Sequence, residues 1–175
     1  MMRKFSPLLL AVVFCLLMSG QARAHEGDVH GKVLTTEAKD LLTDPQSPAY
    51  LPEYDEIADT VYFNDIKEGS VEEDNLLQIP FFEEVPSLSW MRHYYNPKTK
   101  EGLWSWPSTI EYGETIWSEA IWKYRHGDKE NAYYKLGRVI HLLEDMSSVP
   151  HVFLDVHVEE SKGYEAWVSN QHKCL

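Results

Sequence analysis

Residues 126–146 show the end of one helix followed by a long amphipathic helix, and this pattern sets the fold class. Gly127 ends the first helix, and Asp128 stands at the N-cap of the second. Apolar residues then recur at helical spacing to about Met146, at Tyr133, Leu136, Val139, Ile140 and Leu143. Helices are also predicted over 32–42, 56–67 and 114–124, the last with an apolar stripe of Ile116, Trp117, Ala120 and Ile121. Strand-like alternation is scarce and no repeat or composition break divides the chain, so we expect one all-α domain, a multi-helix bundle.

The amino terminus has the form of a secretory signal peptide. Arg3 and Lys4 precede an apolar run over 8–18, and an Ala-x-Ala cleavage site ends at Ala24. The apolar run is about half as long as a bilayer span requires. We therefore expect a signal peptide over 1–24, a mature domain over 25–175 that begins with His25, and no transmembrane anchor. The protein would be periplasmic or secreted.

The mature domain is strongly acidic. Residues 1–24 contain three cations and no acid, so cleavage changes the formal net charge from −12 to −15. Such a charge disfavours long polyanions held on basic patches, and adsorption to anionic membranes by charge alone. Cys15 leaves with the signal and Cys174 remains alone, which excludes an internal disulfide. Bound metal would be a natural supplement to the core.

Five potential metal ligands fall within residues 141–165. His141 and Asp145 stand four residues apart, on one face of the predicted helix. We expect Pro150 to end that helix and to turn His151 back toward the same face, with His157 and Glu165 further along. Imidazole and carboxylate are ligands of zinc above all. Spacing alone leaves two other interpretations open, a core histidine bonded to a carbonyl and a surface His–Asp pair.

The stretch 136–146 followed by Val149-Pro150-His151 resembles the central metal-binding helix of the zinc-dependent phospholipase C and S1/P1 nuclease superfamily. That helix has Asp four residues after a His, and a Pro-His element that ends ten residues after the same His. The resemblance implies that Asp145 bridges two zinc ions, that His141 binds the first ion, and that His151 starts a third site. It assigns His157 and Glu165 to complete the third site, with Glu160 as a substitute.

Two upstream segments extend the resemblance. Gly69, the acidic run 72–74 and the motif His-Tyr-Tyr-Asn-Pro over 93–97 resemble the family's Gly, Glu-Asp and His-Phe-Tyr-x-Pro pattern. On that match Asp74 and His93 join the first zinc, with Glu73 as an alternative ligand. The other interpretation of 72–74 is a solvated acidic run.

The mature amino terminus supplies the last part of the resemblance. The family binds its second zinc with the amine and carbonyl of its first residue, commonly Trp, and a nearby His. Here His25 and His30 take those places, with Asp145 shared. A frayed, histidine-containing terminus is the other interpretation.

The resemblance implies a secreted, monomeric phosphodiester hydrolase with three Zn²⁺ ions, in which Asp74 orients or deprotonates the attacking water. We expect a phospholipase C that acts on phospholipid head groups. Glu165 matches the phospholipase branch, and 152–158 lack the Gly-Gly-Asn segment of the nuclease branch. A nuclease acting on single-stranded nucleic acid is the alternative. Because the chain stops ten residues after Glu165, where relatives continue, a non-catalytic secreted zinc-binding protein is the second alternative.

Overall fold

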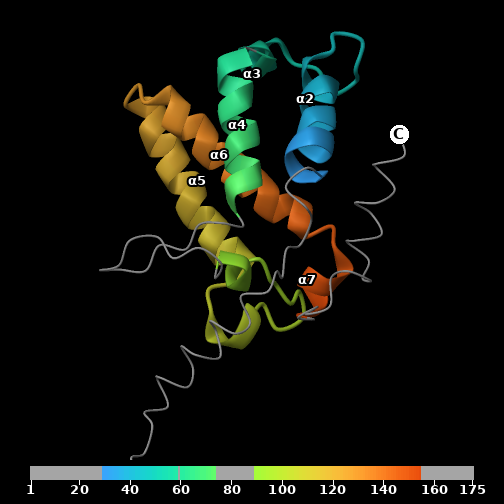
Figure 1. Cartoon of the computed structure of the whole chain (residues 1–175), viewed down its shortest axis with the longest axis vertical. Coiled ribbons are helices and arrows are strands. Elements are labelled where there is room, and N and C mark those ends of the chain that lie inside the picture. The colour runs from blue at the N-terminus through green and yellow to red at the C-terminus, as the bar shows by residue number, and fades with distance from the viewer. Residues whose placement is uncertain (1–28, 59, 74–88, 155–175) are drawn as a thin grey trace, which may run out of the picture.

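The computed structural model describes residues 29–58, 60–73 and 89–154, which form helices joined by short connections (Figure 1). No strand occurs in these ranges, which confirms the all-α prediction. The predicted signal peptide lies outside the described residues. The elements are η1 (Val29–Leu34), α2 (Thr35–Thr43), η2 (Pro52–Tyr54), α3 (Asp55–Ala58), α4 (Thr60–Glu72), η4 (Ser89–Arg92), η5 (Leu103–Ser105), α5 (Thr109–Arg125), α6 (Lys129–Asp145) and α7 (Val149–Phe153).

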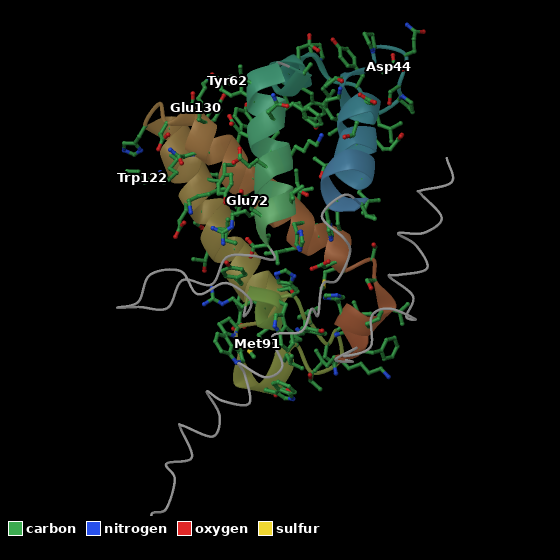
Figure 2. The ribbon with its side chains drawn as sticks, in the orientation of Figure 1. Asp44, Tyr62, Glu72, Met91, Trp122 and Glu130 are labelled. Carbon is green, nitrogen blue, oxygen red and sulfur yellow. The ribbon has the colours of Figure 1, made fainter. Side chains whose placement is uncertain are left out.

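Helix α6 is the centre of the bundle. It packs against α4 on one side and α5 on the other, while α2 lies beside α4 (Figure 1). The short helix α7 follows α6 after a tight turn. The segment with η4 and η5 lies at the end of the bundle where α4 and α6 finish, as the positions of Glu72 and Met91 in Figure 2 show.

The boundaries of α6 agree closely with the predicted ones. Gly127 has a φ of 84°, a left-handed conformation that glycine adopts readily, and it ends α5 as predicted. Asp128 occupies the N-cap position, but its side chain makes no cap hydrogen bond and instead accepts from Lys123 and Asn131, each at 2.8 Å. Leu142 is buried and Leu143 is 66% exposed, so the apolar face is rotated from the predicted one near the carboxyl end.

Helix α5 begins at Thr109, before the predicted start at 114. The reason is a capping box, in which Ser108 Oγ accepts from the backbone N–H of Glu111 and the Glu111 carboxylate accepts from that of Ser108. Ile116 and Ala120 are buried, whereas Trp117 is 47% exposed, so the apolar stripe is narrower than predicted.

Each of the two helices predicted over 32–42 and 56–67 is divided into two elements, and the second also continues beyond its predicted end. The segment 32–42 contains the end of η1 and most of α2. The segment 56–67 contains most of α3 and the first half of α4, which continues to Glu72. This extension carries Gly69, Ser70 and Glu73 to the side of α6 where the predicted metal ligands lie.

Two glycines let the backbones of α4 and α6 touch. A Cβ atom on Gly137 would lie 1.9 Å from the carbonyl oxygen of Ile66, and one on Gly69 would lie 1.9 Å from that of Tyr134. Neither position has room for a side chain. The close crossing brings the carbonyl group of Ser70 within reach of α6.

A small aromatic cluster holds the segment between η4 and α5. Its buried members are Trp90, Met91, Tyr94 and Leu103, with Trp106 and Leu154 packed against them. Tyr94 also stacks on the ring of His151, with centroids 4.7 Å apart and planes at 13°. The cluster therefore fixes the position of the loop that contains His93.

No helix in 29–58, 60–73 or 89–154 combines the length and the apolar character that crossing a bilayer requires.

Candidate metal centre

The structure brings five of the predicted ligands together at one end of the bundle. They come from η1, the loop after η4, α6 and α7, and each is at most 1% exposed: His30, His93, His141, Asp145 and His151. The surface-pair interpretation of His141 and Asp145 is therefore wrong. The other interpretation, a core histidine bonded to a carbonyl, describes one contact of His141, because its buried ring bonds to the carbonyl oxygen of Ser70. It does not account for the four buried imidazoles around the carboxylate of Asp145.

Asp145 is the centre of this group, and its two oxygens face different partners. Oδ2 lies 2.7 Å from His93 Nδ1, 3.3 Å from His141 Nε2 and 3.9 Å from His151 Nδ1. Oδ1 lies 3.5 Å from His30 Nε2. This division between two sides is what a bridging carboxylate requires. One ligand atom each from His30, His141 and Asp145 lie within 4.8 Å of one another, so these three residues can hold one metal ion.

Three histidines are held with Nδ1 as the donor. His141 Nδ1 donates to the carbonyl oxygen of Ser70 at 2.7 Å, and His151 Nδ1 donates to that of His93 at 2.8 Å. His30 Nδ1 donates to Glu144 Oε2 at 2.6 Å. Because carbonyl and carboxylate oxygens accept these protons, each neutral ring carries its lone pair on Nε2. A second group that fixes the tautomer in this way is characteristic of metal-binding histidines.

The donor set fits a divalent cation. Both oxygens of Asp145 are buried and make no hydrogen bond of good geometry within the described residues, although imidazole nitrogens surround them. The rings of His30 and His141 stack with centroids 3.9 Å apart, and His141 Nε2 lies 3.3 Å from His93 Nδ1. A cation among these atoms would satisfy the carboxylate and several lone pairs at once.

Charge in the centre is balanced internally. Burial would raise the pKa of Asp145, but His151, His141 and His93 hold that pKa well below its ordinary value. Burial acts against the charged form of His93, yet the carboxylates of Asp145 and Glu73 raise its pKa to about 9. A bound metal ion would supply the positive charge that the proton on His93 otherwise provides.

Glu73, the alternative ligand from the acidic run, is fully buried. One of its oxygens accepts a charged hydrogen bond from Arg138 Nε, and the other lies 3.8 Å from His93 Nε2. Burial opposes its ionisation, while His93 and Arg138 lower its pKa. At this residue the interpretation of 72–74 as a solvated acidic run is wrong. Glu73 thus lies beside His93 and also pairs with Arg138. Among the described residues, no other carboxylate is seen to pair with Arg138.

Glu144, Thr35 and Ser70 complete the surroundings of His30, and the sequence did not reveal them. The hydroxyl of Thr35 donates to Glu144 Oε1 at 3.1 Å and lies 3.0 Å from the hydroxyl of Ser70. Burial raises the pKa of Glu144 to about 7, against the effect of the Thr35 hydrogen bond. Glu144 and its partner His30 are 114 positions apart in the chain, so no local sequence pattern predicts their contact.

The remaining predicted site residues lie outside the described residues: His25, Asp74, His157, Glu160 and Glu165. The structure therefore brings together the ligands around Asp145, and the full three-zinc arrangement remains a prediction.

Comparison with known proteins adds no family assignment. A scan against protein-family models and a search of curated proteins found no match to this chain.

Proposed function

We propose that the protein is an exported, zinc-dependent phosphodiester hydrolase. The observation that carries the proposal is the position of Asp145, fully buried, with Oδ1 facing His30 and Oδ2 facing His93 and His141. A carboxylate shared between two ligand groups is the arrangement of a multinuclear site. Histidine and carboxylate ligands without cysteine favour zinc in a catalytic rather than a structural role.

The predicted ligands divide around this carboxylate. By the resemblance, His30 and Asp145 would hold one ion together with the amino-terminal His25, while His141, His93, Asp145 and Asp74 would hold a second. The distances also allow a smaller arrangement, in which one ion is shared by His30, His141 and Asp145. His151 would bind a third with His157 and Glu165. Zinc bound there supplies positive charge that activates a water molecule and neutralises the oxygens of a phosphodiester.

The chain's own residues keep the ligands in place. Ser70 and His93 offer carbonyl oxygens to two imidazoles, and Glu144 offers a carboxylate to a third. Each contact fixes a tautomer and a ring orientation before metal or substrate arrives. We propose Asp74 as the group that orients or deprotonates the attacking water.

We propose phospholipid head groups as the substrate, by the resemblance of Glu165 to the phospholipase branch. The net charge of −12 supports this choice over long nucleic acid, because a polyanion would be repelled. Parallel assays on phosphatidylcholine vesicles and single-stranded DNA test the substrate class, and cleavage of DNA alone would overturn the lipid assignment.

The decisive experiment measures zinc per chain and turnover on protein exported with its own signal, so that His25 is free. We expect about three zinc ions per chain, as the resemblance implies. Asp145→Asn should lose zinc and turnover, whereas His126→Asn, which changes an exposed histidine outside the centre, should keep both. Asp74→Asn should lose turnover. Zinc without any turnover would instead identify a non-catalytic zinc-binding protein, and a folded chain without zinc would reject both.

A further inference from the structure

A polar cavity outside the candidate metal centre is lined in part by Arg138. Its volume is about 610 Å³, and it is bordered by the start of α5, by α6 and by the segment that joins η5 to α5. Three cationic side chains and two aromatic rings line it: Arg92, Lys135, Arg138, Trp106 and Tyr112. The proposed function uses none of these five residues.

Arg92 is the cation with unused binding capacity. Its guanidinium carbon lies 4.5 Å from the ring centroid of Tyr112 and 5.8 Å from that of Trp106. Its Nε is buried and has no hydrogen-bond partner in the described part of the chain, where no carboxylate pairs with it either. A buried guanidinium donor without an acceptor is costly, and an anion in the cavity would remove that cost.

The acidic groups of the wall are already bound. The carboxylate of Glu111 closes the capping box at Ser108, and Glu119 pairs with Lys135. Arg138 is 7% exposed and pairs with Glu73, which lies outside the cavity. The wall therefore presents Arg92 as a charge that no carboxylate within the described residues neutralises.

Tyr112 adds a neutral donor beside Arg92. Its hydroxyl oxygen accepts from Arg138 Nη2 at 2.6 Å, so its own proton is left to donate. Burial raises the pKa of Tyr112 to about 12, with Arg138 and Arg92 acting in the opposite direction, and the hydroxyl stays protonated at neutral pH. Guanidinium and hydroxyl donors side by side match the acceptors of a tetrahedral oxyanion.

We propose that this cavity is a binding site for a phosphate group, with Arg92 as its anchor and Tyr112 and Lys135 as further donors. The site adjoins the metal centre, because Arg92 precedes His93 in the chain and Arg138 joins Tyr112 to Glu73. The phosphate group comes either from free inorganic phosphate or from a small phosphomonoester. The proposal does not rest on the zinc hydrolase assignment.

The test follows the indole N–H resonance of Trp106, which lines the cavity, while inorganic phosphate or glycerol phosphate is added to the full exported chain. Trp106 lines the cavity and is none of the predicted metal ligands. The same titration of Asp145→Asn, whose metal centre is impaired, separates binding in the cavity from binding at the centre, and the shift should persist in that variant. We expect a saturable shift in the wild type, and the tighter of the two probes identifies the source of the phosphate. Arg92→Gln should raise the midpoint about tenfold or more, the effect of losing a charge-assisted hydrogen bond.

Lys98→Gln removes one exposed charge away from the cavity and should leave the midpoint unchanged. If Arg92→Gln does not fold, Lys135→Gln carries the test with an expected rise of a few fold. The proposal is overturned if the wild-type resonance shows no saturable shift with either probe. It is equally overturned if the folded cavity variant binds as tightly as Lys98→Gln.

Discussion

Glu144 and Asp145 are neighbours in the chain with different tasks. Asp145 faces four imidazoles, whereas Glu144 is bonded to the outer nitrogen of His30 and to Thr35. The Glu144 contact keeps the proton of His30 on Nδ1 and directs Nε2 toward Asp145. A side chain in this position tunes a metal site without binding the metal.

Replacing Glu144 with Gln should therefore weaken zinc binding and leave the fold intact. The amide keeps the shape of the carboxylate but loses its charge, so the orientation of His30 becomes less favourable. We expect the affinity for zinc to fall about 10-fold to 100-fold. Competition with a coloured chelator measures it.

Glu68→Gln is the matched control, because it makes the same chemical change on the exposed face of α4. Equal zinc affinities for the two variants would show that Glu144 has no part in the centre.

At the level of the elements, the crossing of α4 and α6 decides whether the centre can form. Gly137 and Gly69 remove the side chains that would hold the two backbones apart, and Ser70 can then meet His141. The orientation of His141 in the candidate metal centre therefore depends on how closely these two helices pack.

Gly137→Ala should destabilise the protein although alanine favours helices. The new Cβ would lie 1.9 Å from the carbonyl oxygen of Ile66, so α4 must move away from α6. Overpacking of this kind costs about 1–3 kcal/mol or more of the free energy of unfolding. Urea unfolding measures that free energy, and zinc content should fall with it.

Gly113→Ala on α5 provides the opposite control. Its Cβ would meet only Leu142 Cδ1, at an ordinary 3.7 Å. There the helical preference of alanine should dominate and stabilise the protein by about 0.5–1 kcal/mol. If both alanine variants are equally stable, the close crossing of α4 and α6 is not real.

A second contact between elements gives a dependence on pH. Glu56 of α3 accepts hydrogen bonds from Lys129, at the start of α6, and from Tyr124 of α5. The hydrogen bond from Lys129, followed by that from Tyr124, lowers the pKa of Glu56 below its ordinary 4.5. A group with a lowered pKa stabilises the fold above its unfolded pKa and loses this effect as the pH falls through the folded pKa.

We therefore expect the melting temperature of the wild type to fall more steeply than that of Glu56→Gln as the pH is lowered from the ordinary pKa of 4.5 through the lower pKa of the folded state. The effect is small, because the pair is partly exposed to solvent and salt screens it. Thermal melts at several pH values measure it, and parallel curves for both proteins would contradict the assignment.

Local patterns predicted the elements better than their ends. Period, caps and Gly127 located α6, and the spacing of His141 and Asp145 identified one face of it. The start of α5 was missed, because Ser108 and Glu111 form a capping box just ahead of the apolar stripe. Trp117 was predicted to belong to that stripe, but its side chain is 47% exposed, whereas Ile116 and Ala120 are buried.

At the scale of the whole molecule, the centre depends on contacts that no local pattern contains. The partners of His30 and Glu73 are 114 and 65 positions away in the chain. The resemblance assigned His30, His93, His141, Asp145 and His151 to one centre, and the structure brings these five buried side chains together. Their division among three ions stays a prediction. The supporting groups Thr35, Ser70 and Glu144 follow only from how the helices pack.

The same long-range contacts mean that a metal ion bound at the candidate centre would link several parts of the molecule. The ligands come from η1, the loop after η4, α6 and α7, and backbone bonds join these parts further, from Tyr95 N to His151 O and from Thr109 N to Tyr94 O. Without a cation, the buried charge of Asp145 is balanced by the surrounding histidines, which lower its pKa in the order His151, His141 and His93. Metal binding to the folded state alone must then stabilise the fold.

Removal of metal with a chelator should accordingly lower the melting temperature. A ligand at about 100 times its dissociation constant stabilises by about 2.7 kcal/mol, which corresponds to roughly 5–10 °C for a chain of this size. Zinc should restore the loss, and magnesium should not, because imidazole ligands suit zinc far better. Asp145→Asn should melt at a temperature that neither chelator nor zinc changes. A wild type that is equally indifferent to both would mean that the buried histidines serve packing alone.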